Sequence, residues 1–159
     1  MDDVDEQMIQ LAVDLGRQGA EAGAGGPFGS VVARGGEVIG QGHNSVLATH
    51  DPTAHAEVNA IRDASRALGS PHLDGTTLYA SCEPCPMCAG AALWARVDRV
   101  VYASSRADAL EWGRFDDDAF WDDIIRPLPE RQLPHTQVGR DRALVAWRWF
   151  SEHASDLHY

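Results

Sequence analysis

His55-Ala56-Glu57 and Pro84-Cys85-Pro86-Met87-Cys88 are the two stretches that best indicate how this chain folds and reacts. The first places a histidine and a carboxylate two residues apart, at the expected start of a helix. The second places two thiols three residues apart at the expected start of another helix, so both thiols project from one face of one turn. Together the two stretches offer three metal ligands and one spare acid.

This set of ligands predicts a catalytic rather than a structural zinc site. A structural site is normally closed by four protein ligands, whereas a catalytic site keeps one position open for water. His55, Cys85 and Cys88 leave that position open, and the N-terminus of a helix favours thiolates over thiols. Glu57 is not needed as a ligand and can act as general acid and base. The pattern H-x-E…P-C-x-x-C is a signature of zinc-dependent deaminases, so the sequence predicts hydrolytic deamination with Zn²⁺ as cofactor.

Three other interpretations of these residues compete with this one. The C-x-x-C could be a redox motif, although that motif usually follows the first strand of a βαβ unit. Cys82 could complete a closed site of three cysteines and one histidine. His55 and Glu57 could be a helix-capping pair, which does not explain why both stretches occur together.

The wider sequence predicts an α/β fold, a three-layer α/β/α sandwich with a mixed central sheet. Met8, Ile9, Ala12, Val13 and Leu15 follow helical spacing in the first segment. Gly35-Gly36 is a hairpin turn signal between two β-rich runs. We expect helices at residues 5–22, 55–68, 85–95 and 140–153, and strands at residues 28–34, 37–45, 76–80 and 99–103. Residues 46–54, 106–118 and 126–134 are expected to be loops or irregular segments.

Length, charge and cysteine count bound the possible functions. At 159 residues, the chain is expected to form a single domain over residues 1–159. Its net charge of -11, with no basic cluster, disfavours nucleic acid as a partner, because such binding depends on Lys and Arg contacts to phosphates. No apolar run approaches the length of a membrane span, and the acidic N-terminus does not resemble a secretory signal. Three cysteines with a C-x-x-C point to a reducing compartment, so we expect a cytoplasmic protein.

With these motifs in view, the chain resembles the cytidine deaminase-like superfamily, and within it the small zinc-dependent bacterial guanine deaminases. The resemblance extends over nearly the whole length. It rests on the motifs GGPFG (25–29), DPTAHAE (51–57), SCEPCPMC (81–88), WAR (94–96) and FDD (115–117), and on the terminal Tyr159. Arg114 departs from the family pattern as one extra residue beside the FDD motif.

The resemblance implies a role for each matching position. His55, Cys85 and Cys88 would bind zinc, and Glu57 would transfer protons. Substrate-binding roles would fall to Asn44 on the base edge, Phe28 stacking on the base, Asp117 near the amino group and Tyr159 closing the pocket, with Ala56 and Trp94 as further candidates. Phe28 could instead be a core residue and Asn44 a turn residue. Asp116, Asp117 and Asp118 could instead cap a following helix.

The expected activity is deamination of an amino-purine base, with guanine converted to xanthine and ammonia. The alternatives are deamination of another amino-heterocycle or nucleoside (guanosine, cytosine or its analogues, an aminotriazine), a tRNA adenosine deaminase, and a non-catalytic zinc-stabilised domain. The expected partners are a small nucleobase and a second copy of the chain. In the family the C-terminal segment, here about residues 140–159, crosses between the subunits of a homodimer.

Overall fold

The computed structural model describes residues 3–154 and 156–157. The chain divides into two compact units, Met1–Phe120 and Trp121–Tyr159. The predicted zinc ligands all belong to the first unit, which also contains the sheet.

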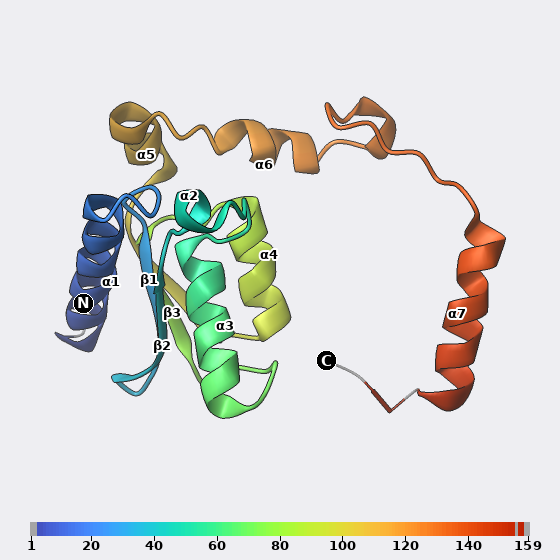
Figure 1. Cartoon of the computed structure of the whole chain (residues 1–159), viewed down its shortest axis with the longest axis horizontal. Coiled ribbons are helices and arrows are strands. Elements are labelled where there is room, and N and C mark those ends of the chain that lie inside the picture. Colours follow the sequence, from blue (N-terminus) through green and yellow to red (C-terminus); the bar gives the residue numbers. More distant parts are fainter. Residues whose placement is uncertain (1–2, 155, 158–159) are drawn as a thin grey trace. The chain divides into compact units, whose positions relative to one another are not determined.

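The sheet of the first unit has four strands in the order β2-β1-β3-β4 (Figure 1). The strands are β1 (Gly29–Arg34), β2 (Glu37–His43), β3 (Thr77–Cys82) and β4 (Arg99–Ser104). β1 pairs antiparallel with both β2 and β3, whereas β3 and β4 are parallel. The expected mixed sheet is therefore confirmed.

The β1–β2 hairpin turns at the predicted glycine pair. Gly35 and Gly36 have φ angles of 55° and 87°. Two consecutive positive φ values match the right-handed twist of the flanking strands and favour glycine at both positions.

Helices cover both faces of this sheet, which gives the expected three layers. Val31 and Val32 are both fully buried and, as neighbours in a strand, point to opposite faces. Val31 packs with Met8 and Ala12 of α1 (Asp3–Glu21). Val32 packs in a second core that includes Ala60 of α3 (Ala56–Leu68) and Ala92 of α4 (Pro86–Ala95).

The strand register brings four chain segments to one edge of the sheet. Gly29 at the start of β1 pairs with His43 at the end of β2, and Ser30 pairs with Ala80 near the end of β3. Cys82 pairs with Ser104, so β3 and β4 end at the same edge. The segments before β1 and after β2, β3 and β4 therefore meet there, and α3 and α4 both begin there.

The structure corrects the expectation that residues 106–118 are irregular. Residues Arg106–Gly113 form the helix α5. Ser105 accepts a hydrogen bond from the Asp108 N–H, and the Asp108 carboxylate accepts one from the Ser105 N–H. This capping box stabilises the start of α5. The helix has no apolar stripe from which the sequence could predict it.

Other loops expected from the sequence contain short helices. The 46–54 segment includes α2 (Val46–Thr49), and the 126–134 segment includes the 3-10 turn η1 (Leu128–Glu130). A further helix, α6 (Asp118–Ile124), follows α5. In the second unit, α7 (Arg140–His153) has the predicted bounds.

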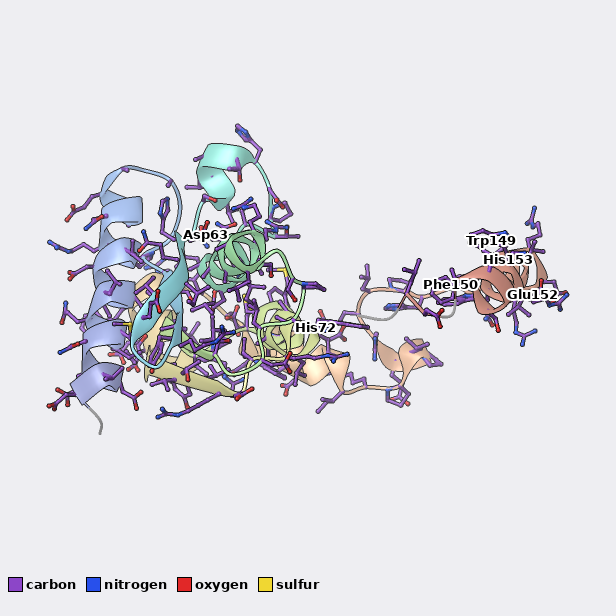
Figure 2. The ribbon with its side chains drawn as sticks, turned by 90° about the horizontal axis from the view of Figure 1, so that it is seen from below. Asp63, His72, Trp149, Phe150, Glu152 and His153 are labelled. Carbon is purple, nitrogen blue, oxygen red and sulfur yellow. The ribbon has the colours of Figure 1, made fainter. Side chains whose placement is uncertain are left out.

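Aromatic side chains pair along α7. The rings of Trp147 and Phe150 meet edge to face with centroids 6.4 Å apart. Trp149 stacks on His153, whose Nδ1 lies 2.9 Å from the Trp149 carbonyl oxygen (Figure 2). Within the described residues, no helix combines the length and apolarity needed to cross a bilayer.

An ion pair between a buried carboxylate and a partly exposed arginine ties α1 to the sheet. Arg99 at the start of β4 donates to both carboxylate oxygens of Asp5, at 3.0 and 2.6 Å, and the Tyr79 hydroxyl donates to the same carboxylate at 2.9 Å. The hydrogen bonds from Arg99 and then from Tyr79 hold the pKa of Asp5 below its usual range. Deprotonated Asp5 therefore stabilises the folded state.

We predict that Asp5→Asn lowers the free energy of unfolding at neutral pH and that its deficit shrinks in acid. Because the folded pKa of Asp5 is depressed, its contribution is present above the unfolded value of about 4. That contribution is lost as the pH falls through the lower folded value. Chemical denaturation of both chains at pH 7 and pH 3, with a chelator present throughout, measures the difference.

The matched control is Asp14→Asn, which removes an exposed carboxylate of the same helix that lies 3.4 Å from Arg17. Exposed pairs contribute little, so this variant should match the parent at both pH values. An equal loss in the two variants at pH 7 would contradict the role given to Asp5.

Candidate functional site

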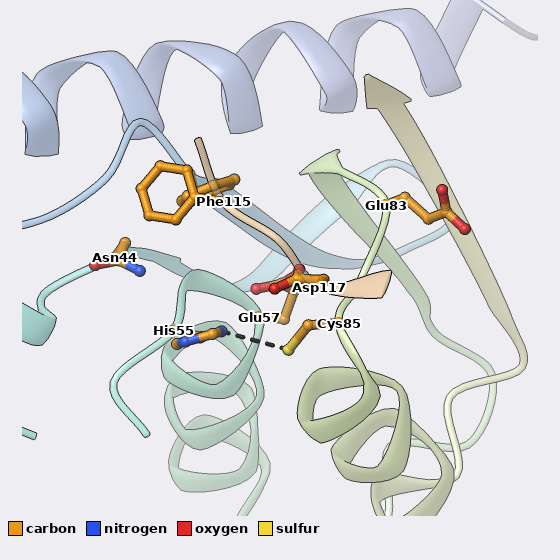
Figure 3. Close-up of a pocket in the computed structure, with 8 residues that line it drawn as sticks. Asn44, His55, Glu57, Glu83, Cys85, Phe115 and Asp117 are labelled. Atoms are coloured by element: carbon orange, nitrogen blue, oxygen red, sulfur yellow. Dashed lines mark hydrogen bonds between the residues drawn. The ribbon is translucent and has the colours of Figure 1, made fainter. Parts of the chain in front are cut away.

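The predicted metal ligands come together at the sheet edge where α3 and α4 begin. His55 is the N-cap of α3 and Cys85 the N-cap of α4, with Cys88 in the first turn of α4. His55 Nδ1 lies 3.5 Å from the sulfur of Cys85, as Figure 3 shows by a dashed line. It also lies 3.5 Å from the sulfur of Cys88. One donor atom from each residue lies within 4.8 Å of the others, which is compact enough to hold one ion.

The two thiols differ sharply in acidity. Interaction with Cys88 and then with His55 lowers the pKa of the Cys85 thiol to about 4, against the opposing effect of burial. The pKa of Cys88 is raised, because its proton is held by Cys85 and because the thiol is buried. Cys85 is therefore the thiol that ionises more readily, and Cys88 is the one that keeps its proton.

This donor set fits zinc. One imidazole and two sulfur ligands, at least one already a thiolate, match the borderline-soft character of Zn²⁺. Cys82 lies outside the group: its thiol donates to the Ser105 carbonyl oxygen at 3.5 Å, and burial raises its pKa. Among the described residues, the structure thus assembles three protein ligands, which is the number found in catalytic sites.

Glu57 lies beside the metal group. Its side chain is almost fully buried, and the Cys88 thiol donates to its Oε2 at 3.4 Å. Burial is the main cause that raises the pKa of this carboxyl. A carboxyl whose pKa is shifted toward neutrality can both hold and release a proton in the working pH range, as general acid–base catalysis requires.

A small cavity of about 60 Å³ opens onto these groups. That volume has room for several water molecules. Its walls are formed by Phe28, Asn44, His55, Glu57, Glu83, Cys85, Phe115 and Asp117 (Figure 3). The structure therefore brings three of the predicted substrate residues, Phe28, Asn44 and Asp117, to the same cavity as the metal group.

Asn44 and Phe28 are held by the segments that flank β1 and β2. Asn44 is buried, its backbone N–H donates to the Phe28 carbonyl at 2.9 Å, and its Oδ1 accepts from the Val46 N–H at 3.2 Å. Asn44 therefore both stabilises a turn and lines the cavity. A side chain at Gly25 would collide with the Asn44 amide, and one at Gly26 would press on the Phe28 ring, so this glycine pair makes room for both.

The structure distinguishes among the three consecutive aspartates. Asp117 lines the cavity, and burial and the Cys85 thiolate raise its pKa. Asp116 Oδ1 is 3.5 Å from the Ala119 N–H, near the start of α6. Asp118 lies 2.8 Å from Arg106. Only Asp117 of the three is placed to meet a ligand in the cavity.

Two further candidates, Ala56 and Trp94, are absent from the cavity wall. Ala56 is fully buried beside His55 but is absent from the wall. Trp94 lies on α4, is 68% exposed and is not among the residues that line the cavity. Tyr159 lies outside the described residues.

Sequence reasoning missed two wall residues, Glu83 and Phe115. The Phe115 ring meets Phe28 edge to face with centroids 4.9 Å apart. The signal for Phe115 was its place in the FDD motif, and the signal for Glu83 was its position two residues before Cys85. Neither signal indicates the direction of the side chain.

Comparison with known proteins agrees with this geometry. The profile of the family described as "Cytidine and deoxycytidylate deaminase zinc-binding region" matches residues 2–104. Guanine deaminase of Bacillus subtilis is 48% identical over 149 residues, which cover 92% of this chain and 95% of that protein. An X-ray structure of guanine deaminase from B. subtilis superposes with a TM-score of 0.92 at 44% identity, covering 100% of this chain and 99% of the other.

Two other proteins are similar to part of this chain. A crystal structure of a protein in complex with 8-azaguanine gives a TM-score of 0.66 at 32% identity, over 71% of this chain and 64% of that one. The tRNA-specific adenosine deaminase of B. subtilis is 40% identical over 100 residues, or 63% of this chain and 62% of that protein.

We predict that Cys85→Ser and Cys88→Ser each greatly reduce zinc binding, whereas Cys82→Ser retains about one zinc ion per chain. Loss of one ligand leaves two, and a hydroxyl is a poor replacement for a thiolate. Metal analysis after dialysis measures the content. Cys82→Ser is the matched control, because all three cysteines are buried and the same atom is exchanged. Loss of zinc on changing Cys82 would instead indicate a closed site with four ligands.

Proposed function

This chain belongs to the cytidine and deoxycytidylate deaminase family, and we propose that it is a zinc-dependent guanine deaminase, which converts guanine and water to xanthine and ammonia. The observation that carries the proposal is the extent of the similarity. Likeness to B. subtilis guanine deaminase runs over 92% of the chain, whereas likeness to the tRNA-specific adenosine deaminase of that organism covers 63%. The buried acid beside the metal group supplies the matching chemistry.

His55, Cys85 and Cys88 would hold the ion. When bound there, zinc activates a water molecule by lowering its pKa toward neutrality. Glu57 would take up the proton that this water loses as its oxygen bonds to the amino-bearing carbon, and would deliver it to the adjacent ring nitrogen. The same carboxyl would then pass the second proton of the added hydroxyl group to the amino group, so that the C–N bond breaks, ammonia leaves and the carbonyl of the product forms. Its raised pKa suits this two-way transfer.

The remaining cavity residues would orient a flat base. Phe28, held edge-on by Phe115, offers an aromatic face for stacking, which is worth about 1–3 kcal/mol per base. Asn44 carries both a donor and an acceptor for the edge of a heterocycle. Asp117 lies across from Asn44 and would meet the amino group. Tyr159, Ala56 and Trp94 remain candidates from the family resemblance.

The proposal includes a cytoplasmic homodimer in which residues of about 140–159 pass to the partner subunit. Trp147 and Trp149 on α7 are mostly exposed in the single chain, as expected for a segment that packs on another copy. The partner of the site itself would be a small nucleobase, since the net charge of -11 opposes binding to nucleic acid.

We predict that Glu57→Gln retains zinc and lowers kcat by roughly 10²–10⁴-fold, because the amide cannot transfer protons. Ammonia release from guanine measures the activity, and metal analysis measures the zinc content. Glu37→Gln, an exposed change on β2, is the control and should leave both values at those of the parent. Retained turnover by Glu57→Gln would indicate a different proton carrier, whereas a parent chain that binds zinc but releases no ammonia would favour a zinc-stabilised domain.

We predict that the purified chain releases ammonia faster from guanine than from guanosine, cytosine, adenine or an aminotriazine. The wall residues Asn44 and Asp117 offer donor and acceptor groups to a purine edge, and a missing partner for a buried polar group costs about 1–3 kcal/mol. Rates measured across this panel test the preference. Brisk release from another member of the panel, with none from guanine, would transfer the assignment to that substrate.

A further inference from the structure

Arg106 bridges two acidic residues that come from different parts of the chain. It is the first residue of α5, directly after the cap residue that follows β4. Its Nε lies 3.1 Å from Glu83 Oε1, and its Nη1 lies 2.8 Å from Asp118 Oδ1. Its backbone N–H also donates to Glu83 Oε2 at 3.3 Å. One guanidinium therefore joins the loop after β3 to the start of α6.

Each of these acids adjoins a residue of the site. Glu83 lines the cavity and precedes Cys85 by two positions, and Asp118 directly follows Asp117. The Glu83 N–H donates to the Ser104 carbonyl at 2.8 Å, so its loop is also fixed to the end of β4. The bridge through Arg106 thus connects the segment that carries a metal ligand with the segment that carries Asp117.

The segment that carries Asp117 is short and irregular, and it is held at both ends. Residues 114–117 link α5 to α6. On one side Phe115 rests against Phe28, and on the other Asp118 is held by Arg106. Backbone hydrogen bonds also fix the segment, since the Asp117 carbonyl accepts from the Phe120 N–H at 3.2 Å. Only the Arg106–Asp118 contact, however, ties the segment to the loop that carries Glu83.

The charge of Arg106 also acts on Asp117. None of the eight residues that line the cavity is lysine or arginine. The Cys85 thiolate disfavours a negative charge on Asp117, while His55 and Arg106 favour it. Arg106 thus lies within electrostatic reach of Asp117 and favours its negative charge, in addition to the contacts that it makes with Glu83 and Asp118.

We propose that Arg106 is a positioning residue for the reaction, fixing Asp117 relative to the metal group by bridging Glu83 and Asp118. The inference rests on the proposed function, in which Asp117 meets the amino group of the substrate. Arg106 itself does not line the cavity and acts through its two partners. Misplacement of an orienting group by about 1 Å can cost up to 10²-fold in rate.

The main test compares Arg106→Gln with Arg106→Lys and with Arg99→Gln. For Arg106→Gln we expect kcat/KM to fall by about 10- to 100-fold with zinc content unchanged. Arg106→Lys should recover only part of this loss, because one ammonium cannot reproduce the fork that reaches two carboxylates. Arg99→Gln is the matched control: it breaks the ion pair with buried Asp5 at the opposite end of β4, so it should reduce stability but leave kcat/KM unchanged.

A double variant separates positioning from general destabilisation. If Arg106 acts through Asp117, then Arg106→Gln should add little to the loss already caused by Asp117→Asn. Multiplicative losses, or an Arg106→Gln chain as active as Arg99→Gln, would overturn the proposal.

A crystal structure of zinc-loaded Arg106→Gln gives a readout that does not depend on activity. We expect the Asp117 carboxylate to leave the position that it has in the parent, and an unmoved carboxylate would overturn the proposal. If the parent releases no ammonia from guanine, the guanine assignment fails on its own. The Arg106 variants are then compared on the amino-heterocycle that the parent does deaminate, and the crystal structure still decides the role of Arg106.

Discussion

Two helix N-termini meet over one group of metal-ligating atoms, and the arrangement of the first unit depends on keeping them there. Buried thiolates are costly unless a cation or aligned dipoles compensate them. The first turns of α3 and α4 supply the dipoles, and the charge of a bound ion supplies the rest. Because β3 and β4 are parallel, the helix between them must start where β3 ends. The crossover therefore delivers Cys85 and Cys88 to that edge without any special loop.

The same edge explains why a buried acid beside the thiols is tolerable. Glu57, Cys85 and Cys88 form a tight group of ionisable side chains. The pKa of Cys85 is lowered, whereas the pKa values of Glu57 and Cys88 are raised. A divalent cation would offset the repulsion among these negative charges and would replace the proton of the Cys88 thiol. Metal binding and folding are coupled in such a site, since the folded chain gathers ligands that are scattered in the unfolded one.

The sequence predicted those features that local spacing controls. The apolar stripe of α1, the glycine turn after β1 and the thiol pair on α4 all depend on residues close in the chain. The sequence did not predict α5, because this helix has no apolar face and begins with the reciprocal hydrogen bonds of Ser105 and Asp108. It also missed Glu83 and Phe115, whose places in the cavity wall depend on partners from distant segments. Long-range contacts of that kind leave no periodic trace in a single sequence.

The metal ligands and the residues proposed to contact the substrate come from different parts of this fold. The metal ligands lie at the starts of α3 and α4. Insertion or deletion of one residue there would shift the ligands of that helix. The opposite wall comes from segments outside those helices: Phe28 precedes β1, Asn44 follows β2, and Asp117 lies between α5 and α6. Such segments accept insertions more readily than helix starts do. A residue inserted near Asp117 can therefore reshape the wall that faces the base without moving a metal ligand. This separation is consistent with the range of the relatives, which include a guanine deaminase and a tRNA-specific adenosine deaminase.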